Sequence, residues 1–183
     1  MHRTSSLLRQ LLTLAALLSA CAQQEQHRPA PSPTATEAPP PRRAQPVAMS
    51  AADYVTRAGA IDLYEIAAAE IALQRSGSGS VRDFAGMMIR AHKGTSSQLS
   101  FAGRRLDLLP ARTMTRKYQV MMEQLRSAQS FDAAYKSQQL KVHREALAIH
   151  SAYATRGSSP TLRPVASAAV PIMQRHLRLL RYL

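Results

Sequence analysis

The segment AADYVTRAGAIDLYEIAAAEIALQR, residues 51–75, gives the clearest indication of the fold. Its side chains recur at intervals of three and four residues, the spacing of one face of an amphipathic α-helix. That face would contain Tyr54, Ala58, Ile61, Glu65, Ala68 and Ala72. Ser50 precedes the segment as a helix-capping residue, and Asp53 lies near the positive end of the helix dipole. The segment therefore predicts a helix with one acidic group on its buried side.

The remainder of the chain repeats this helical spacing and contains no alternating strand pattern. Four more helices are predicted, over residues 81–106, 114–127, 131–156 and 161–182. We expect the second to begin after Ser80 with a capping pair completed by Asp83, and Pro171 to kink the last. Four long helices and one short helix in the crossover predict an all-α fold, an antiparallel four-helix bundle over residues 50–183.

Each long helix also has an ionisable group on its predicted inner stripe. These groups are Glu65, His92, His143 with His150, and His176. We can compare their depths by counting from the tight loops near residues 78 and 158, assuming that both loops lie at the same end. At about 1.5 Å per residue, Glu65, His92, His143 and His176 then differ in depth by less than about 8 Å. They are predicted to meet in one layer, with His150 about one and a half turns nearer the loop.

Three interpretations of this layer remain open on sequence alone. Glu65, His92, His143 and His176 offer the nitrogen and oxygen ligands that suit one transition metal ion, such as zinc, iron, manganese or copper. They also fit a metal-free network of buried hydrogen bonds in which Glu65 pairs with a charged histidine and fixes the helix register. Alternatively, the histidines lie at the edge of the stripe and face water.

A spaced set of residues across the predicted bundle resembles the ferritin-like "domain of unknown function 4142" family of exported bacterial proteins. The set comprises Glu65, Leu73, residues 81–85 (VRDFA), Met88, His92, Phe131, Asp132, Tyr135, His143, Leu162, Ala166, Pro171, His176 and Leu177. The resemblance implies a ferritin-like bundle and brings no assigned activity. Members commonly have an acidic residue or a histidine where this chain has Ala91. None of the glutamates after residue 50 is followed by a histidine three residues later, which disfavours a di-iron oxidase or an iron store.

The first 49 residues predict an export signal and a tether. Residues 1–20 combine Arg3 and Arg9 with a short apolar run, as signal peptides do. The sequence Leu-Ser-Ala-Cys ending at Cys21 resembles the lipobox of bacterial lipoproteins, which implies that Cys21 is acylated. Residues 22–49 contain seven of the eleven prolines and are predicted to be a disordered spacer. We therefore expect a protein on the periplasmic side of the bacterial cell envelope, anchored to the membrane by its N-terminal lipid.

Composition excludes several classes of protein. A single cysteine rules out an internal disulfide and any four-thiolate metal site, and a net charge of +13 rules out an acidic ion sponge. The densest basic cluster, Arg104, Arg105, Arg112, Arg116 and Lys117, fits either a solvated surface that keeps the protein soluble or a binding surface for anionic envelope polymers. Nucleic acid is not an expected partner, because no aromatic residues interleave with these charges.

The function expected from the sequence is a structural or interaction role in the envelope, with a mononuclear metal site or a buried Glu and His site. Two alternatives stand beside it. One is a metal-dependent redox or stress-protection enzyme of the ferritin-like class, and the other is an electrostatic binder of envelope polymers. No motif for nucleophilic catalysis or phosphate binding supports a particular reaction.

Overall fold

The computed structural model describes residues 48–183, and these form five α-helices and a terminal 3-10 turn. The helices are α1 (Ala51–Arg75), α2 (Gly79–Arg104), α3 (Arg116–Ser127), α4 (Phe131–Arg156) and α5 (Arg163–Leu179), followed by η1 (Leu180–Tyr182). The all-α prediction is confirmed. The predicted signal segment, Cys21 and almost all of the proline-rich tether lie outside the described residues.

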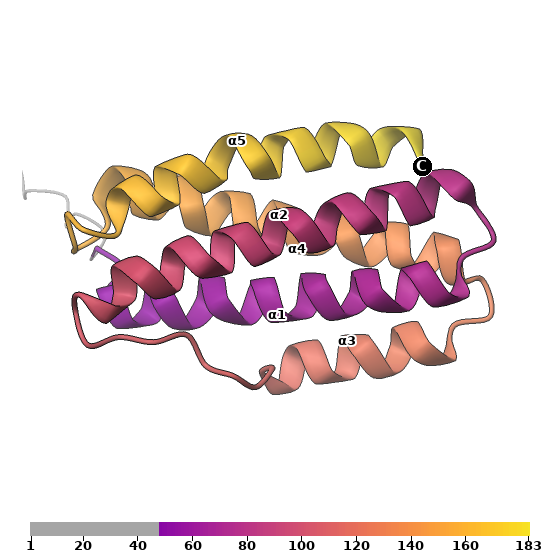
Figure 1. Cartoon of the computed structure of the whole chain (residues 1–183), viewed down its shortest axis with the longest axis horizontal. Coiled ribbons are helices and arrows are strands. Elements are labelled where there is room, and N and C mark those ends of the chain that lie inside the picture. Colours follow the sequence, from indigo (N-terminus) through magenta and orange to yellow (C-terminus); the bar gives the residue numbers. More distant parts are fainter. Residues whose placement is uncertain (1–47) are drawn as a thin grey trace, which may run out of the picture. The chain divides into compact units, whose positions relative to one another are not determined.

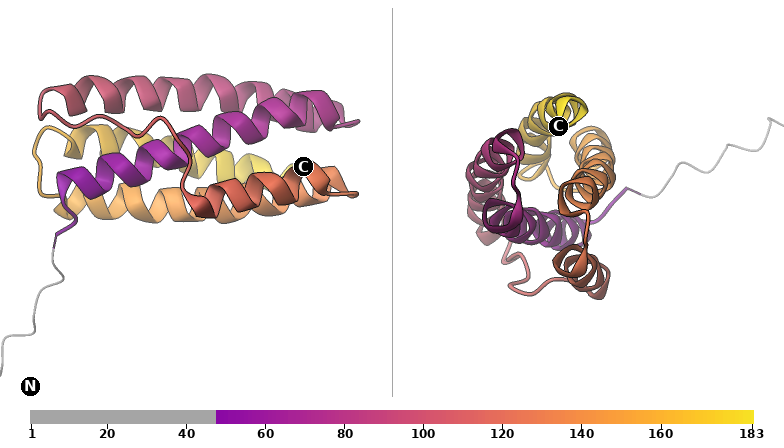
Figure 2. Two further views of the ribbon diagram at one scale, coloured as in Figure 1. Left: turned by 90° about the horizontal axis from the view of Figure 1, so that it is seen from below. Right: turned by 90° about the vertical axis from the view of Figure 1, so that its right-hand side faces the viewer.

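The four long helices form a bundle in which neighbours run antiparallel. Helices α1 and α5 point one way, and α2 and α4 point the other way (Figure 1). Each of α1 and α5 packs against both α2 and α4. Helix α3 lies outside this bundle, against α1 and α4, within the long crossover that joins α2 to α4 (Figure 2). The predicted bundle with a short helix in its crossover is therefore confirmed.

The assumption that both tight loops lie at the same end is wrong. The α1–α2 turn and the α4–α5 turn lie at opposite ends of the bundle (Figure 1), because the crossover carries the chain back along the bundle before α4 begins. The inner groups still share a level. Glu65, His92 and His143 each lie within two residues of the middle of their helices. His176 is 13 residues after the start of α5, as His143 is 13 residues before the end of α4.

Several helix ends differ from the prediction by a few residues. The cap of α1 is as expected, since the Ser50 Oγ accepts a hydrogen bond from the backbone N–H of Asp53 at 3.0 Å. Helix α2 is capped by Ser78, which accepts from the N–H of Val81 at 3.4 Å, so the predicted start after Ser80 is wrong. The run of alternating serine and glycine offers several equivalent caps. Helix α3 begins at residue 116, and α5 spans 163–179 and continues through Pro171.

The buried face of α4 is wider than the stripe predicted from helical spacing, which contains Leu140, His143, Leu147 and His150. Both histidines are buried, but Leu140 and Leu147 are only half-buried. The buried positions of α4 are Phe131, Tyr135, Gln139, Val142, His143, Ala146, Ile149, His150 and Tyr153. Helix α4 contacts α1, α5 and α3, so a wide arc of its surface is covered and no single stripe describes it.

The guanidinium of Arg75 holds α3 against the bundle. It donates hydrogen bonds to the backbone carbonyls of Leu125, Arg126 and Ala128 at 2.6–3.0 Å, groups that lack intrahelical partners at a helix C-terminus. It also lies 4.8 Å from the centre of the Phe131 ring. The hydrophobic core of the bundle is built by residues between Met49 and Leu183. Within residues 48–183, no helix has the length and apolar character required to cross a bilayer.

Candidate metal centre

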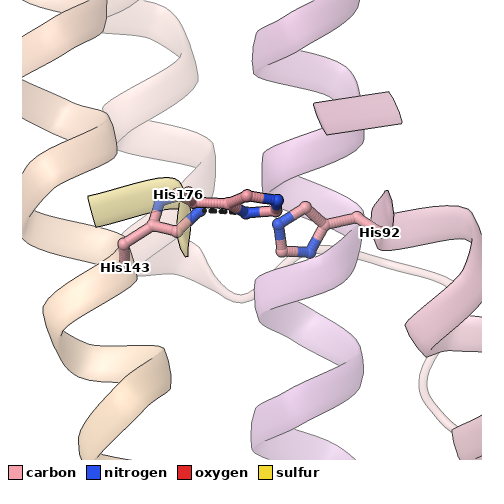
Figure 3. A group of neighbouring side chains, drawn as sticks. All are labelled: His92, His143 and His176. Atoms are coloured by element: carbon pink, nitrogen blue, oxygen red, sulfur yellow. Dashed lines mark hydrogen bonds between the residues drawn. The ribbon is translucent and has the colours of Figure 1, made fainter. Parts of the chain in front are cut away.

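Three imidazole rings from three different helices meet in the middle of the bundle. His92 comes from α2, His143 from α4 and His176 from α5, and their rings point toward one another (Figure 3). One ring nitrogen of each histidine lies within 4.8 Å of the others. Their exposed fractions are 0%, 0% and 2%. The interpretation in which these histidines face water is therefore wrong.

Glu65 of α1 supplies an acidic group at the same level. Its side chain is fully buried, and its Oε1 lies 3.2 Å from the Nδ1 of His143. Neither oxygen of Glu65 has a hydrogen-bond partner, however, because the Nδ1 of His143 is directed at the backbone carbonyl of Gln139, 2.9 Å away. Burial raises the pKa of Glu65 to about 8, even though the nearby charge of His92 and the side-chain amide of Gln139 lower it. Three of the four residues predicted from the sequence thus converge, and Glu65 lies beside them with no hydrogen bond to either carboxyl oxygen.

Asp62 orients the ring of His92. The Nδ1 of His92 lies 2.8 Å from Asp62 Oδ1, and the hydroxyls of Thr95 and Ser96 donate to the same carboxylate at 2.9 and 3.0 Å. A carboxylate accepts, so the Nδ1 donates and the Nε2 of His92 faces the centre of the layer, where it has no partner. Burial lowers the pKa of His92, but the hydrogen bond and charge of Asp62 outweigh it and raise the pKa overall.

The other two imidazoles are joined by a hydrogen bond. Since the carbonyl of Gln139 can only accept, the Nδ1 of His143 carries a proton, and the Nε2 of His143 is free to accept from the Nδ1 of His176 at 3.1 Å. Burial lowers the pKa of His143 well below its usual value and that of His176 to about 3, and the charge of His92 lowers both further. Both rings are neutral at neutral pH, which is the form that binds metal ions.

Asp62 and Gln139 were not predicted as site residues from the sequence. Asp62 is four residues after Ala58 and three before Glu65, so the helical spacing that identified Glu65 also places Asp62 near the buried face. Its contact with His92 depends on the packing of α1 against α2, which no spacing reveals. The hydroxyl of Tyr135 and the side-chain amide of Gln139 are also buried without hydrogen-bond partners.

His150 lies apart from this layer. Its Nδ1 is 3.0 Å from the hydroxyl of Tyr54 on α1, and its side chain is not one of the three converging imidazoles. Burial is the main influence on the pKa of His150 and lowers it to about 4. His150 is thus a buried histidine whose inward nitrogen already has a partner.

The arrangement of His92, His143 and His176 fits a transition metal ion. Three converging imidazole nitrogens match ligands found around zinc, copper and iron. Glu65 lies beside this group, 3.2 Å from the Nδ1 of His143, and is not one of the converging ligands. The hydrogen bonds of His92 to Asp62 and of His143 to Gln139 are of the kind that orient metal-binding histidines. In a tetrahedral site with bonds of about 2.1 Å, nitrogens lie roughly 3.4 Å apart, so the layer would contract slightly around an ion.

Comparison with solved structures finds the same fold in a copper-binding protein. One match is described as CopM in the Cu(II)-bound form, with a TM-score of 0.64 and 16% sequence identity, covering 74% of this chain and 95% of that one. A second is described as CopM in the Cu(I)-bound form, with a TM-score of 0.62 and 15% identity, covering 73% and 94%. At this identity the likeness shows the fold alone. No curated protein matches the sequence.

Residues 36–183 match a family description that covers the whole helical bundle. The match includes each of the four groups that converge in the bundle, from Glu65 to His176. The chain belongs to the family described as "Domain of unknown function (DUF4142)".

Proposed function

We propose that this protein binds a transition metal ion inside its helical bundle, through His92, His143 and His176, with Glu65 as the adjoining acidic group. The observation that carries the proposal is the set of unpaired atoms in this layer: both oxygens of Glu65 and the Nε2 of His92 are buried without hydrogen bonds. An unpaired buried polar group costs about 1–3 kcal/mol, and a charged one costs more. A hydrogen-bond network that only fixed helix register would satisfy these atoms.

Copper is the first ion to test, and zinc the second. Imidazole nitrogen suits copper, zinc and iron, and at a given nitrogen and oxygen site divalent copper binds more tightly than zinc, iron or manganese. The structurally similar CopM is described in two copper-bound forms, which makes copper a reasonable ion for this fold. The cluster itself is built from residues of this chain and does not depend on that likeness.

The burial of the cluster supports binding of the ion rather than its use in catalysis. Catalytic metal sites keep one coordination position open to a substrate or to water. Here the three converging imidazoles and the adjoining Glu65 are at most 2% exposed, so neither substrate nor bulk water reaches the centre. Of the main pockets in the part of the chain that the structure describes, none is lined by Glu65, His92, His143 or His176. A resident ion held within the bundle is the function that this geometry supports best.

We also propose that the protein is exported and held at the periplasmic side of the envelope by a lipid on Cys21. The support is the lipobox-like sequence ending at Cys21 and the short apolar run before it. Metabolic labelling with a palmitate analogue tests this. We expect label in the native chain and none in Cys21→Ser, which should also leave the membrane fraction. Label retained in Cys21→Ser would contradict the proposal.

Metal binding is best measured on a chain that begins at residue 44. This chain keeps the whole core, which is built from Met49 onward, and it removes Cys21, His2 and His27 as competing ligands. Cu(II) and Zn(II) would be titrated separately, with elemental analysis of the washed protein. We expect one tightly bound equivalent of copper.

A matched pair of variants makes this measurement specific. His143→Asn removes a converging ligand, and His150→Asn removes a buried histidine of the same helix that lies outside the cluster. We expect at least a hundredfold weaker binding in His143→Asn and less than a threefold change in His150→Asn. Equal effects of the two substitutions, or less than a tenth of an equivalent bound by the native chain, would rule out the proposed centre and leave the metal-free network.

A further inference from the structure

A hollow surface lies along the last turns of α2, between two large apolar side chains that are open to solvent. Phe101 of α2 is 71% exposed, and Leu109 of the crossover is 62% exposed. Between them lie Arg104 and the serines at positions 96 and 100, which line the hollows on both sides. The hollow on the Leu109 side has a volume of about 300 Å³ and also reaches Arg112. We call Phe101, Arg104, Arg105, Leu109 and Arg112 the α2-end surface.

The basic residues of the predicted cluster are not equivalent in the structure. Lys117 forms an ion pair with Glu145, and Arg116 lies 3.9 Å from Glu123. Arg104, Arg105 and Arg112 are exposed and have no ion-pair partner among residues 48–183. The uncompensated part of the cluster is therefore the part that adjoins Phe101 and Leu109.

The position of this surface in the bundle relates it to the N-terminal segment. The C-terminal end of α2 and the start of α1 lie at the same end of the bundle (Figures 1 and 2), so the described part of the chain begins at that end. The 28 residues between Cys21 and Ser50 can span several tens of Å, at about 3 Å per residue where they are extended. A chain anchored at Cys21 would keep this end within reach of the bilayer and raise its effective concentration there.

We propose that the α2-end surface docks on an anionic phospholipid bilayer. Exposed arginines attract lipid phosphates, and adjacent large apolar side chains enter the boundary between headgroups and acyl chains. The α2-end surface carries both kinds of side chain next to each other. This proposal rests on the proposed membrane anchor for its location, and it does not depend on metal binding.

Vesicle co-sedimentation of the chain that begins at residue 44 tests the docking without the lipid. The probes are vesicles of mixed phosphatidylglycerol and phosphatidylcholine, compared with vesicles of phosphatidylcholine alone. We expect binding to the anionic vesicles only, weakening as salt is raised because salt screens exposed charges. Binding of equal strength to both vesicles, or binding that salt leaves unchanged, would overturn the proposal.

Two sets of substitutions locate the binding surface. The triple variant Arg104→Ala, Arg105→Ala, Arg112→Ala should bind anionic vesicles about a hundredfold more weakly, since each basic residue near the surface contributes about fivefold. The matched control, Arg175→Ala, Arg178→Ala, Arg181→Ala, removes the same charge from exposed positions toward the other end of the bundle. We expect it to weaken binding less than threefold. Equal losses in the two variants would mean attraction by net charge alone and would overturn the proposal.

The apolar part of the surface has its own test. Phe101→Ala with Leu109→Ala should weaken vesicle binding about tenfold while the protein keeps its net charge and helical circular dichroism. Unchanged binding in this variant would show that no side chain enters the bilayer and would also overturn the proposal. Because these measurements use a chain without Cys21, they can fail while palmitate labelling succeeds, and the converse also holds.

Discussion

His143 and His150 lie seven residues apart on the same helix, and both are buried, yet their surroundings differ in one decisive respect. The inward nitrogen of His150 is paired with the hydroxyl of Tyr54. Both ring nitrogens of His143 also have partners, the carbonyl of Gln139 and the Nδ1 of His176. His143 differs in lying beside Glu65, whose two oxygens have no hydrogen-bond partner, and in a layer where the Nε2 of His92 is also unpaired. A buried histidine is therefore not by itself a sign of a metal site. What distinguishes the two is whether the neighbouring polar atoms are already satisfied.

The pKa values do not separate these two histidines. Burial is the main cause that lowers the pKa of His143 well below its usual value and that of His150 to about 4, so both are neutral under ordinary conditions. The two histidines differ instead in whether the polar atoms around them have hydrogen-bond partners. A metal ion would give the Glu65 oxygens and the Nε2 of His92 the partner that the surrounding protein does not supply.

The largest expected effect is stabilisation of the bundle by metal, and it tests the comparison directly. With free Cu(II) at about a hundred times its dissociation constant, the free energy of unfolding should rise by about 3 kcal/mol. His143→Asn should lose this gain and His150→Asn should keep it. Thermal unfolding followed by circular dichroism, with and without metal, provides the measurement. A gain that survives in His143→Asn would place the ion elsewhere.

The next largest effect concerns Asp62, which orients His92 without joining the cluster. Removing a partner that orients a metal-binding histidine typically weakens the metal site ten- to a hundredfold, so we expect that loss for Asp62→Asn. Ser96→Ala removes only one of the donors to the Asp62 carboxylate and should weaken binding about threefold at most. Competition with a chromophoric chelator gives the dissociation constants. An Asp62→Asn chain that binds as tightly as the native chain would show that the ring of His92 is held by packing alone.

The bundle and the members of the buried Glu and His layer could be inferred from spacing, since helix periodicity puts Glu65, His92 and His176 on buried faces. The reason that they share a level was not inferred correctly. Counting from two loops assumed that these lie at the same end, whereas the crossover places them at opposite ends (Figure 1). Glu65, His92 and His143 nevertheless lie at a similar depth, because each is near the middle of its helix.

The supporting contacts could not be inferred, because they depend on the rotation of one helix against another. Asp62 has the helical spacing of a buried residue, but only the packing of α1 on α2 brings it to the Nδ1 of His92. The buried face of α4 differs from the predicted stripe for a related reason, since contacts with three helices bury Gln139 and Val142 and leave Leu140 and Leu147 half-buried. Periodicity records which side of a helix is apolar, and it does not record what lies opposite each position.

The lowered pKa of His150 makes the stability of the protein depend on pH. Its pKa is about 4 in the folded protein and about 6.5 in the unfolded chain. His150 therefore binds a proton more weakly in the folded protein than in the unfolded chain. Its contribution to the free energy of unfolding is fully present above pH 6.5 and is lost as the pH falls toward 4. Between pH 7 and 5 this amounts to about 2 kcal/mol.

His150→Asn should remove this part of the pH dependence in the metal-free protein. Urea unfolding at pH 7 and at pH 5, in the presence of a chelator, gives the free energies of unfolding. We expect the difference between the two pH values to be about 2 kcal/mol smaller in His150→Asn than in the native chain. Tyr182→Phe, at a position 85% exposed, should leave the difference unchanged. Identical slopes in the native and His150→Asn chains would show that His150 gains a proton as readily when folded as when unfolded.

The smallest expected effect comes from removing the Tyr54 hydroxyl, which is the hydrogen-bond partner of His150. Tyr54→Phe keeps the ring that stacks on Tyr153 at 3.9 Å and removes the hydroxyl that pairs with His150. The Nδ1 of His150 then remains buried without a partner, which should cost about 1 kcal/mol of unfolding free energy. Metal affinity should stay within threefold of the native value, because Tyr54 touches no member of the converging group. A large loss of metal binding in Tyr54→Phe would mean that the two sets of histidines act as one network, and the contrast between them would no longer hold.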